Sequence, residues 1–132
     1  MKKVHVYDTT LRDGTQGEGF VLSVPEKLML AEMLDDFGIG FIEGGWPGSN
    51  PRDETFFKEV KHLNLRNAKI AAFGATRRAD KTCDEDGSIQ ALVKAEVPVV
   101  TVFGKSSSFH AQQVLGIAPG DNLELITDSV QY

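Results

Sequence analysis

The chain has 132 residues, of which 41% are hydrophobic and 25% charged, a balance typical of a soluble globular domain. A formal net charge of −5 argues against a general nucleic-acid-binding surface. No apolar run approaches the ~20 residues of a membrane-spanning helix, and no signal-peptide pattern precedes the first strand. We therefore expect a cytoplasmic domain with neither a membrane nor a nucleic-acid partner. Its single cysteine, Cys83, is expected on an exposed loop and cannot form an internal disulfide.

The first predicted strand is the β-branched run at 4–7. After a long polar loop, Ser23 and Glu26 have the spacing of a capping box, which predicts the start of a helix. Gly38 is expected to end that helix. Four apolar residues at helical spacing predict its buried stripe: Leu30, Met33, Leu34 and Phe37.

The second predicted strand is 39–43, and the Gly- and Pro-rich segment 44–51 after it predicts a loop. Asn50 is expected to cap the next helix, with Pro51 at its first position, a site where proline is favoured. The buried face of this second helix is expected to consist of Phe56, Val60 and Leu63.

The third predicted strand is 69–73, followed by a polar loop and a short helix that buries Ile89, Leu92 and Val93. The fourth predicted strand is 97–103, whose nearly continuous apolar character predicts that both of its faces are covered. Segment 109–115 is expected to form a helical turn. A final helix is expected to begin near Asp121, with one apolar side formed by Leu123, Ile126 and Val130.

The four predicted strands begin near positions 4, 39, 69 and 97, which are 35, 30 and 28 residues apart. This spacing is typical of βα units in a parallel α/β layer. Since a complete eight-stranded barrel takes ~250 residues, we expect the N-terminal half of a TIM (β/α)8 barrel, with about four parallel βα units over 1–132. A flavodoxin-like sheet is the alternative from spacing alone. The open edges of half a barrel predict pairing with a second copy, and we expect a homodimer formed through those edges or through apolar helix faces.

Chemically versatile residues gather after the first two strands. Arg12 is always charged and can hold two hydrogen bonds on a carboxylate or an enolate-like oxygen, and Asp13 can offer oxygen to a hard cation. Glu43 ends the second strand. Loops after the C-terminal ends of parallel strands open on one side, so Arg12, Asp13 and Glu43 should converge there. The same reasoning places Gln16, Arg77 and Lys105 on that side, although a merely solvated strand-to-loop junction remains open.

Several motifs carry a family resemblance. Segment 8–16, DTTLRDGTQ, resembles the first motif of the DRE-TIM metallolyases, which include isopropylmalate, homocitrate and citramalate synthases and hydroxymethylglutaryl-CoA lyase. The second motif, FIEGGWPGSNP at 41–51, looks most like the citramalate synthase branch. Segments 73–78 and 103–106 resemble that branch too. The similarity runs along the whole chain in the family's order, and isopropylmalate or homocitrate synthase is the nearest alternative.

The resemblance implies a Claisen-type acyltransferase that condenses acetyl-CoA with pyruvate to give citramalate, toward isoleucine biosynthesis. It implies a divalent metal ion (Mg, Mn or Zn), with Asp13 as a metal ligand. Arg12 and Glu43 would be catalytic, Arg12 stabilising the developing oxyanion. Arg12 and Gln16 would bind the 2-oxo acid. Glu43 would hydrogen-bond to metal-bound water or to Arg12.

The chain also departs from the family pattern. It contains none of the His-x-His pair that supplies further metal ligands, and its histidines are His5, His62 and His110. The family's later acid/base glutamate and its regulatory domain are absent too. We therefore expect this half alone to have no useful turnover, and a non-catalytic domain that folds and self-associates is the alternative of another class. Residues 106–110 depart from the family, which leaves His110 without a role, and Lys105 either faces the CoA or substrate entrance or is solvated.

Overall fold

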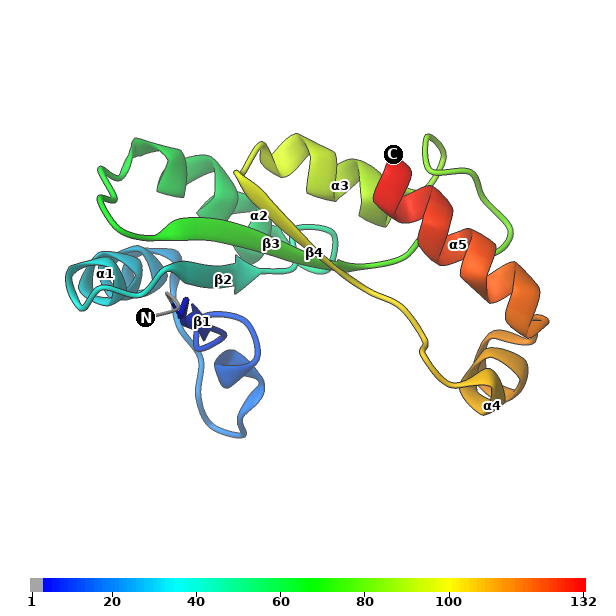
Figure 1. The fold of residues 1–132 in the computed structure, drawn as a ribbon. Helices are drawn as coiled ribbons and strands as arrows, with labels where there is room; N and C mark the ends of the chain where they lie inside the picture. Colours follow the sequence, from blue (N-terminus) through cyan, green and yellow to red (C-terminus); the bar gives the residue numbers. More distant parts are fainter. Residues whose placement is uncertain (1–3) are drawn as a thin grey trace.

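The computed structural model describes residues 4–132, which alternate strands and helices (Figure 1). The strands are β1 (Tyr7–Asp8), β2 (Phe41–Gly45), β3 (Lys69–Ala75) and β4 (Val99–Phe103). The helices are α1 (Val24–Asp36), α2 (Pro51–Glu59), α3 (Gly87–Ala95), α4 (Ser108–His110) and α5 (Pro119–Gln131). Short 3-10 turns occur at Gly14–Gln16 and Val60–His62, and a π-helical turn at Ala111–Leu115. Within 4–132, no helix has both the length and the apolar character that crossing a bilayer demands.

All four strands are parallel and lie in the order β1-β2-β3-β4, which confirms the predicted succession of βα units. Helices α1, α2 and α3 pack against the sheet and one another, and α5 lies beyond the C-terminal ends of β3 and β4 (Figure 1). The first strand is shorter than the predicted 4–7, because only Tyr7 and Asp8 pair with β2.

The sheet curls as the wall of a barrel does. The Tyr7 hydroxyl on β1 hydrogen-bonds to Glu43 on the neighbouring β2 and also to Thr101 on β4, at the opposite edge. In a flat sheet β1 and β4 would lie three inter-strand spacings apart, roughly 14 Å. The contact therefore requires a concave face, and Tyr7, Glu43 and Thr101 all point into it.

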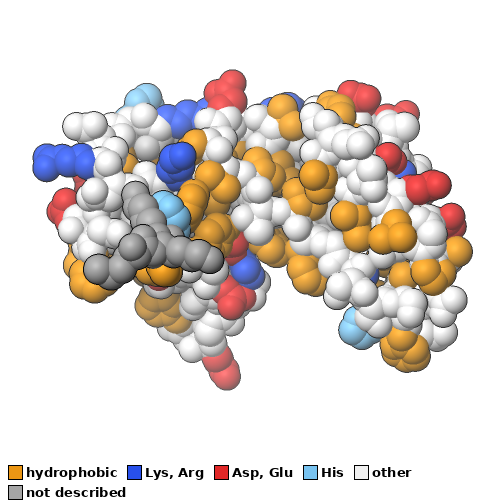
Figure 2. Space-filling view, viewed as in Figure 1, with side chains coloured by type: hydrophobic (Ala, Val, Ile, Leu, Met, Phe, Trp, Pro, Cys, Tyr) orange, Lys and Arg blue, Asp and Glu red, His pale blue; other side chains and the backbone are white. Residues whose placement is uncertain are grey.

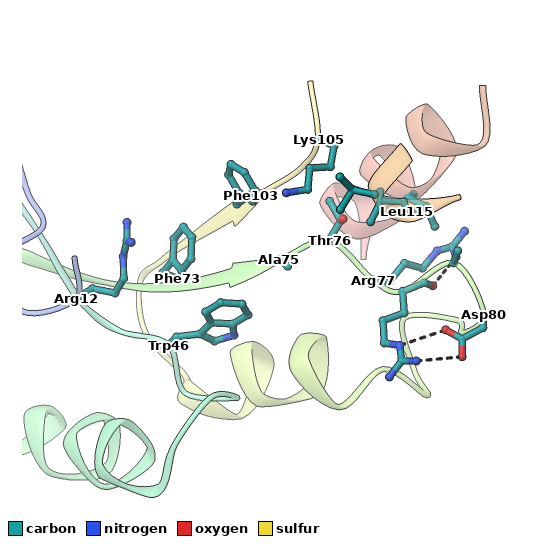
Figure 3. Close-up of a pocket in the computed structure, with 14 residues that line it drawn as sticks. Arg12, Trp46, Phe73, Ala75, Thr76, Arg77, Asp80, Phe103, Lys105 and Leu115 are labelled. Atoms are coloured by element: carbon teal, nitrogen blue, oxygen red, sulfur yellow. Dashed lines mark hydrogen bonds and ion pairs between the residues drawn. The ribbon is translucent and has the colours of Figure 1, made fainter. Parts of the chain in front are cut away.

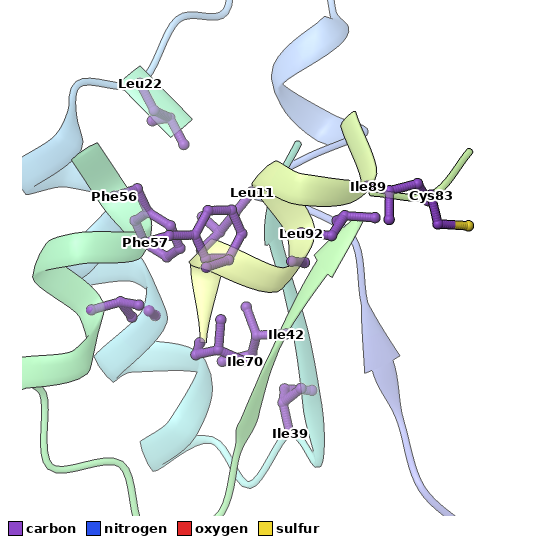
Figure 4. Packing of buried hydrophobic residues seen from close by; sticks show 14 residues of the cluster. Leu11, Leu22, Ile39, Ile42, Phe56, Phe57, Ile70, Cys83, Ile89 and Leu92 are labelled. Atoms are coloured by element: carbon purple, nitrogen blue, oxygen red, sulfur yellow. The ribbon is translucent and has the colours of Figure 1, made fainter. Parts of the chain in front are cut away.

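The hydrophobic core lies between the sheet and the helices (Figure 4). Ile42 and Ile70 come from the strands, and Phe56 and Phe57 from α2, where the two rings meet edge to face at 5.4 Å. Helix α2 lies so close to β2 that a Cβ atom at Gly44 would collide with the Phe56 ring. Glycine at this position therefore sets the distance between the strand and its helix.

Helix α1 confirms one local prediction and corrects another. The capping box forms, since the Glu26 carboxylate accepts the Ser23 backbone N–H at 2.7 Å and the Ser23 hydroxyl accepts the Glu26 N–H. The predicted apolar stripe is wrong in part, because Met33 is 59% and Phe37 83% exposed, whereas Leu30 and Leu34 are partly buried. The helix instead buries Lys27, Ala31 and Asp35, since both charged residues have partners elsewhere in the fold.

The later helices also turn other faces inward than predicted. The Asn50 cap and Pro51 start of α2 are confirmed, with Phe56 and Val60 buried. Val93 of α3 is exposed although Ile89 and Leu92 are buried as predicted. Helix α5 begins at Pro119, two residues before Asp121, which confirms the predicted start. It buries Asn122, Leu125 and Ser129, and leaves the predicted Leu123 and Val130 exposed.

Two further predictions are wrong for reasons of position. β4 is an edge strand, so Val100 and Phe103 are 45% and 51% exposed instead of covered on both sides. Hydrophobic side chains accordingly reach the surface over the middle of the face in Figure 2. Cys83, predicted to lie on an exposed loop, is instead buried and joins the core cluster, where burial raises the pKa of its thiol.

Asp35 fastens the end of α1 to the segment that leads into β3. Its buried carboxylate accepts the backbone N–H groups of Arg66, Asn67 and Ala68 at 2.9, 2.7 and 2.6 Å. Burial alone would raise the pKa of Asp35, but these backbone hydrogen bonds outweigh it and hold the pKa below the ordinary 3.8. The negative charge of Asp35 therefore stabilises the folded state.

We expect Asp35→Asn to lower the free energy of unfolding by about 2 kcal/mol at neutral pH, since an amide offers one acceptor oxygen to three donors. Because the folded-state pKa lies below the unfolded 3.8, the contribution of Asp35 is complete above 3.8 and is lost as the pH falls through the lower value. Urea unfolding should show a smaller difference in unfolding free energy between Asp35→Asn and the unmodified chain at strongly acidic pH than at neutral pH. The neighbouring, exposed Asp36→Asn is the control, and an equal loss there would contradict the prediction.

Candidate active site

A tight loop after β1 presents Arg12 to the concave face. The Thr9 carbonyl oxygen accepts the backbone N–H groups of Arg12, Asp13 and Gly14 at 3.1, 2.8 and 3.1 Å. Leu11, which is fully buried, anchors the same loop in the core. The loop is therefore fixed from both sides, and the direction of the Arg12 side chain with it.

Arg12 bridges two carboxylates. Its Nε donates to Glu43 Oε1, and its Nη1 donates to Asp13 Oδ1 at 2.8 Å. The guanidinium carbon also lies 4.1 Å from the centre of the Phe73 ring on β3, a cation–π contact. Arg12, Asp13 and Glu43 thus meet at one point above adjacent strands, as the strand ends predicted.

Glu43 is almost completely buried, with 2% of its surface exposed, and both of its oxygens are occupied. Oε1 accepts from Arg12, and Oε2 accepts the Tyr7 hydroxyl at 2.7 Å. Burial, with the hydrogen bond and charge of Glu43, raises the pKa of Tyr7 to about 12 despite the opposing Thr101 hydrogen bond. Tyr7 is therefore a neutral donor at physiological pH, and Glu43 holds Arg12 in place.

A cavity of about 770 Å³ opens beside this cluster at the C-terminal ends of the strands (Figure 3). Its aromatic wall is formed by Trp46, Phe73 and Phe103, with the Trp46 and Phe73 rings edge to face at 5.5 Å. The rest of the lining includes four cations, one carboxylate and an apolar rim: Arg12, Arg77, Arg78 and Lys105, then Asp80, and Val114, Leu115 and Leu125. Its volume is in the range of small-molecule sites.

The loop that carries Trp46 rests on a buried ion pair. Lys27 Nζ of α1 donates to Asp53 Oδ1 at 2.6 Å, and Asp53 Oδ2 accepts the Trp46 backbone N–H at 2.9 Å. The strand register shifts between Glu43 and Gly45, and Gly45 has φ +153°. A Cβ atom at Gly45 would lie 2.6 Å from the Asp53 carboxyl carbon, so glycine permits this approach.

The other predicted site residues lie elsewhere or are committed to structural contacts. Gln16 is exposed in its 3-10 turn and does not line the cavity. Arg77 lines it, but its Nε donates to Asp128 Oδ2 of α5 at 3.0 Å. His110, to which the sequence assigns no role, is exposed on α4. Sequence reasoning missed the cluster residues Tyr7, Phe73 and Thr101, whose common signal is that they face the same side of adjacent strands as Glu43.

The residues present do not make a metal site by themselves. Within 4–132, no three His, Cys, Asp or Glu side chains come close enough to hold an ion. Asp13, whose side chain is 60% exposed, is the carboxylate that retains a free oxygen, because both Glu43 oxygens already accept hydrogen bonds. One carboxylate falls short of the several oxygens that a divalent cation requires.

The family model described as HMGL-like matches residues 3–132, essentially the whole chain. The chain belongs to the HMGL-like family. Solved structures with a similar fold include HMG-CoA lyase of Bacillus subtilis. It superposes with a TM-score of 0.70 at 17% sequence identity, and the match covers 99% of this chain and 42% of that one. For hydroxymethylglutaryl-CoA lyase of Pseudomonas aeruginosa the TM-score is 0.69 at 23% identity, over 98% and 42%. These likenesses confirm the predicted half of a TIM barrel.

Curated HMGL-like relatives are more similar in sequence. The chain is 53% identical to (R)-citramalate synthase of Geobacter sulfurreducens over all its 132 residues, and 51% identical to that of Aquifex aeolicus over 131. It is 37% identical to 2-isopropylmalate synthase of Shouchella clausii. The predicted resemblance to the citramalate synthase branch is thus confirmed. The chain spans about a quarter of the length of each of these relatives.

Proposed function

We propose that residues 1–132 form the first half of the catalytic barrel of a citramalate synthase-like acyltransferase. The reaction would join acetyl-CoA to pyruvate and release CoA, toward isoleucine biosynthesis. The observation that carries this proposal is Arg12, held between Glu43 and Asp13 at the wall of a cavity of small-molecule size. The 53% identity to a citramalate synthase supports the choice of substrates.

In this proposal Arg12 stabilises the negative charge that develops on the ketone oxygen of the 2-oxo acid. Its Nε and Nη1 are used by Glu43 and Asp13, whereas Nη2 donates to no group within residues 4–132 and is left for a substrate oxygen. A fixed donor aimed at developing charge accelerates a reaction because it needs no reorganisation. Glu43 acts by fixing the guanidinium, and substrate binding by Gln16 stays a prediction.

Asp13 is proposed as one ligand of a divalent metal ion (Mg, Mn or Zn). The other ligands would come from groups that are not among residues 4–132. Such an ion, when bound, polarises the ketone of a 2-oxo acid. A homodimer and a cytoplasmic location also stay predictions. The open edge at β4, with Val100 and Phe103 exposed, is a surface that a second copy could cover.

A chimera tests the proposed function. The chain would replace the matching 132 residues of the Geobacter sulfurreducens citramalate synthase, so that the rest of that enzyme completes the barrel. We expect the chimera to release free CoA thiol from acetyl-CoA with pyruvate, and much more slowly with 2-oxoisovalerate or 2-oxoglutarate. The isolated chain should release none. Preference for another oxo acid would contradict the proposal, as would an inactive chimera that folds normally by circular dichroism.

A further inference from the structure

Charge is unevenly compensated around the cavity. Arg12 is paired with Glu43 and Asp13, Arg77 with Asp128, and Arg78 with Asp80. Lys105, by contrast, forms no ion pair with any residue of the described range 4–132. Each arginine at the cavity therefore has a carboxylate partner that would repel an incoming anion, whereas no carboxylate of residues 4–132 is paired with the lysine.

The Lys105 side chain turns into the cavity rather than out to solvent. Its Nζ lies 5.0 Å from the centre of the Phe103 ring, and Figure 3 shows it directed back over that ring toward Phe73. The Phe103 and Phe73 rings are 6.5 Å apart, and the Arg12 guanidinium covers Phe73. Two cations thus stand at the two ends of one aromatic wall.

Helix α5 fixes the backbone on which Lys105 stands. The buried Asn122 donates from Nδ2 to the Lys105 carbonyl oxygen at 2.8 Å. A Cβ atom at Gly104 would lie 2.9 Å from Ile126 Cγ1, so α5 lies directly against this segment. The lysine is therefore presented from a fixed position, which is the property of a binding residue.

We propose that Lys105 binds an anionic oxygen, carboxylate or phosphate, of a substrate held in this cavity. The uncharged part of that substrate lies along Phe103 and Leu115. The identity of the substrate rests on the proposed function: the carboxylate would belong to the 2-oxo acid, the phosphate to the acyl-CoA. Lys105 supplies a cation that forms no ion pair within residues 4–132, whereas Arg12 is paired with two carboxylates and keeps Nη2 for the ketone oxygen.

The test uses the single tryptophan of the chain, Trp46, which lines the same cavity and reports its occupancy without turnover. Its fluorescence would be titrated with pyruvate, inorganic phosphate, acetyl-CoA and the uncharged thioester S-acetyl-N-acetylcysteamine. We expect Lys105→Met, which keeps the apolar stem, to raise the Kd of anionic ligands about tenfold and to leave the uncharged thioester unaffected. Weakened pyruvate binding identifies a carboxylate, and weakened binding of acetyl-CoA and phosphate alone identifies a phosphate.

Lys69→Met is the matched control, because it removes the same charge from an exposed position at the opposite end of β3. It should leave every Kd unchanged, and Lys105→Arg should restore most of the affinity. Equal anion affinity in Lys105→Met and the unmodified chain would overturn the proposal. So would equal weakening by Lys69→Met, or no saturable response to any anion at millimolar concentration. Binding is measured without catalysis, so a chimera without activity would remove the proposed function and leave the anion site standing.

Discussion

Replacement of Arg12 by leucine is expected to lower the activity of the chimera at least 100-fold, the usual effect of removing a donor to a developing oxyanion. It should also lower the free energy of unfolding of the isolated chain by about 3 kcal/mol. Glu43 is 2% exposed, and without Arg12 its charge would have the Tyr7 hydroxyl as its remaining partner. Free-CoA release and urea unfolding measure the two effects.

A double variant separates these contributions. Arg12→Leu combined with Glu43→Leu removes both charges and should recover much of the lost stability while activity stays low. Arg12→Lys keeps the charge but loses the fork that reaches Glu43 and Asp13, so intermediate activity is expected. If Arg12→Leu cost no stability, the buried pair would not hold the site together.

The second large effect is expected beneath the Trp46 loop. Asp53→Asn keeps the shape of the side chain but leaves Lys27, which is 1% exposed, without a counter-charge. We expect a loss of about 4 kcal/mol in urea unfolding, with part regained when Lys27→Met is added. Trp46 fluorescence should change as well, because Asp53 also holds the Trp46 backbone N–H.

The pH dependence of this loss has a definite sign. Burial lowers the pKa of Lys27 below 10.5 in spite of the opposing hydrogen bond and charge of Asp53. Without that charge the pKa should fall further, so at alkaline pH the unfolded state binds more protons than the folded state. Asp53→Asn should therefore regain stability as the pH rises toward 10.5. The adjacent, exposed Glu54→Gln is the control and should change stability little.

Local signals in the sequence were sufficient for the order of the elements and for the starts of α1 and α2. Both helix caps depend on residues only three positions apart: Ser23 with Glu26, and Asn50 with Asp53. Each cap can therefore be recognised within a short stretch of sequence. The strand spacing was also sufficient for a parallel layer, and hence for the meeting of Arg12, Asp13 and Glu43.

Contacts between distant residues were the part that the sequence could not supply. Hydrophobicity predicted that Met33 and Phe37 of α1 face the core. The helix buries Lys27 and Asp35 instead, because each has a partner in the fold. Those partners lie 26 or more positions away in the sequence, so no local pattern indicates them. Tyr7 and Thr101 are 94 positions apart and meet only because the sheet curls. Residues whose role depends on that curvature have no local pattern from which to be recognised.

The consecutive glycines at the end of β2 have a consequence for how this segment can evolve. Gly44 faces the Phe56 ring and Gly45 the Asp53 carboxyl, so any missense change adds an atom where α2 already has one. A smaller residue at position 56 would make room but leave a void in the core, and a shorter residue at position 53 would leave the Lys27 ammonium without its counter-charge. Neither glycine can therefore be replaced through a sequence of tolerated single mutations. Strand and helix are therefore epistatically locked, and drift in this lineage should pass through other positions.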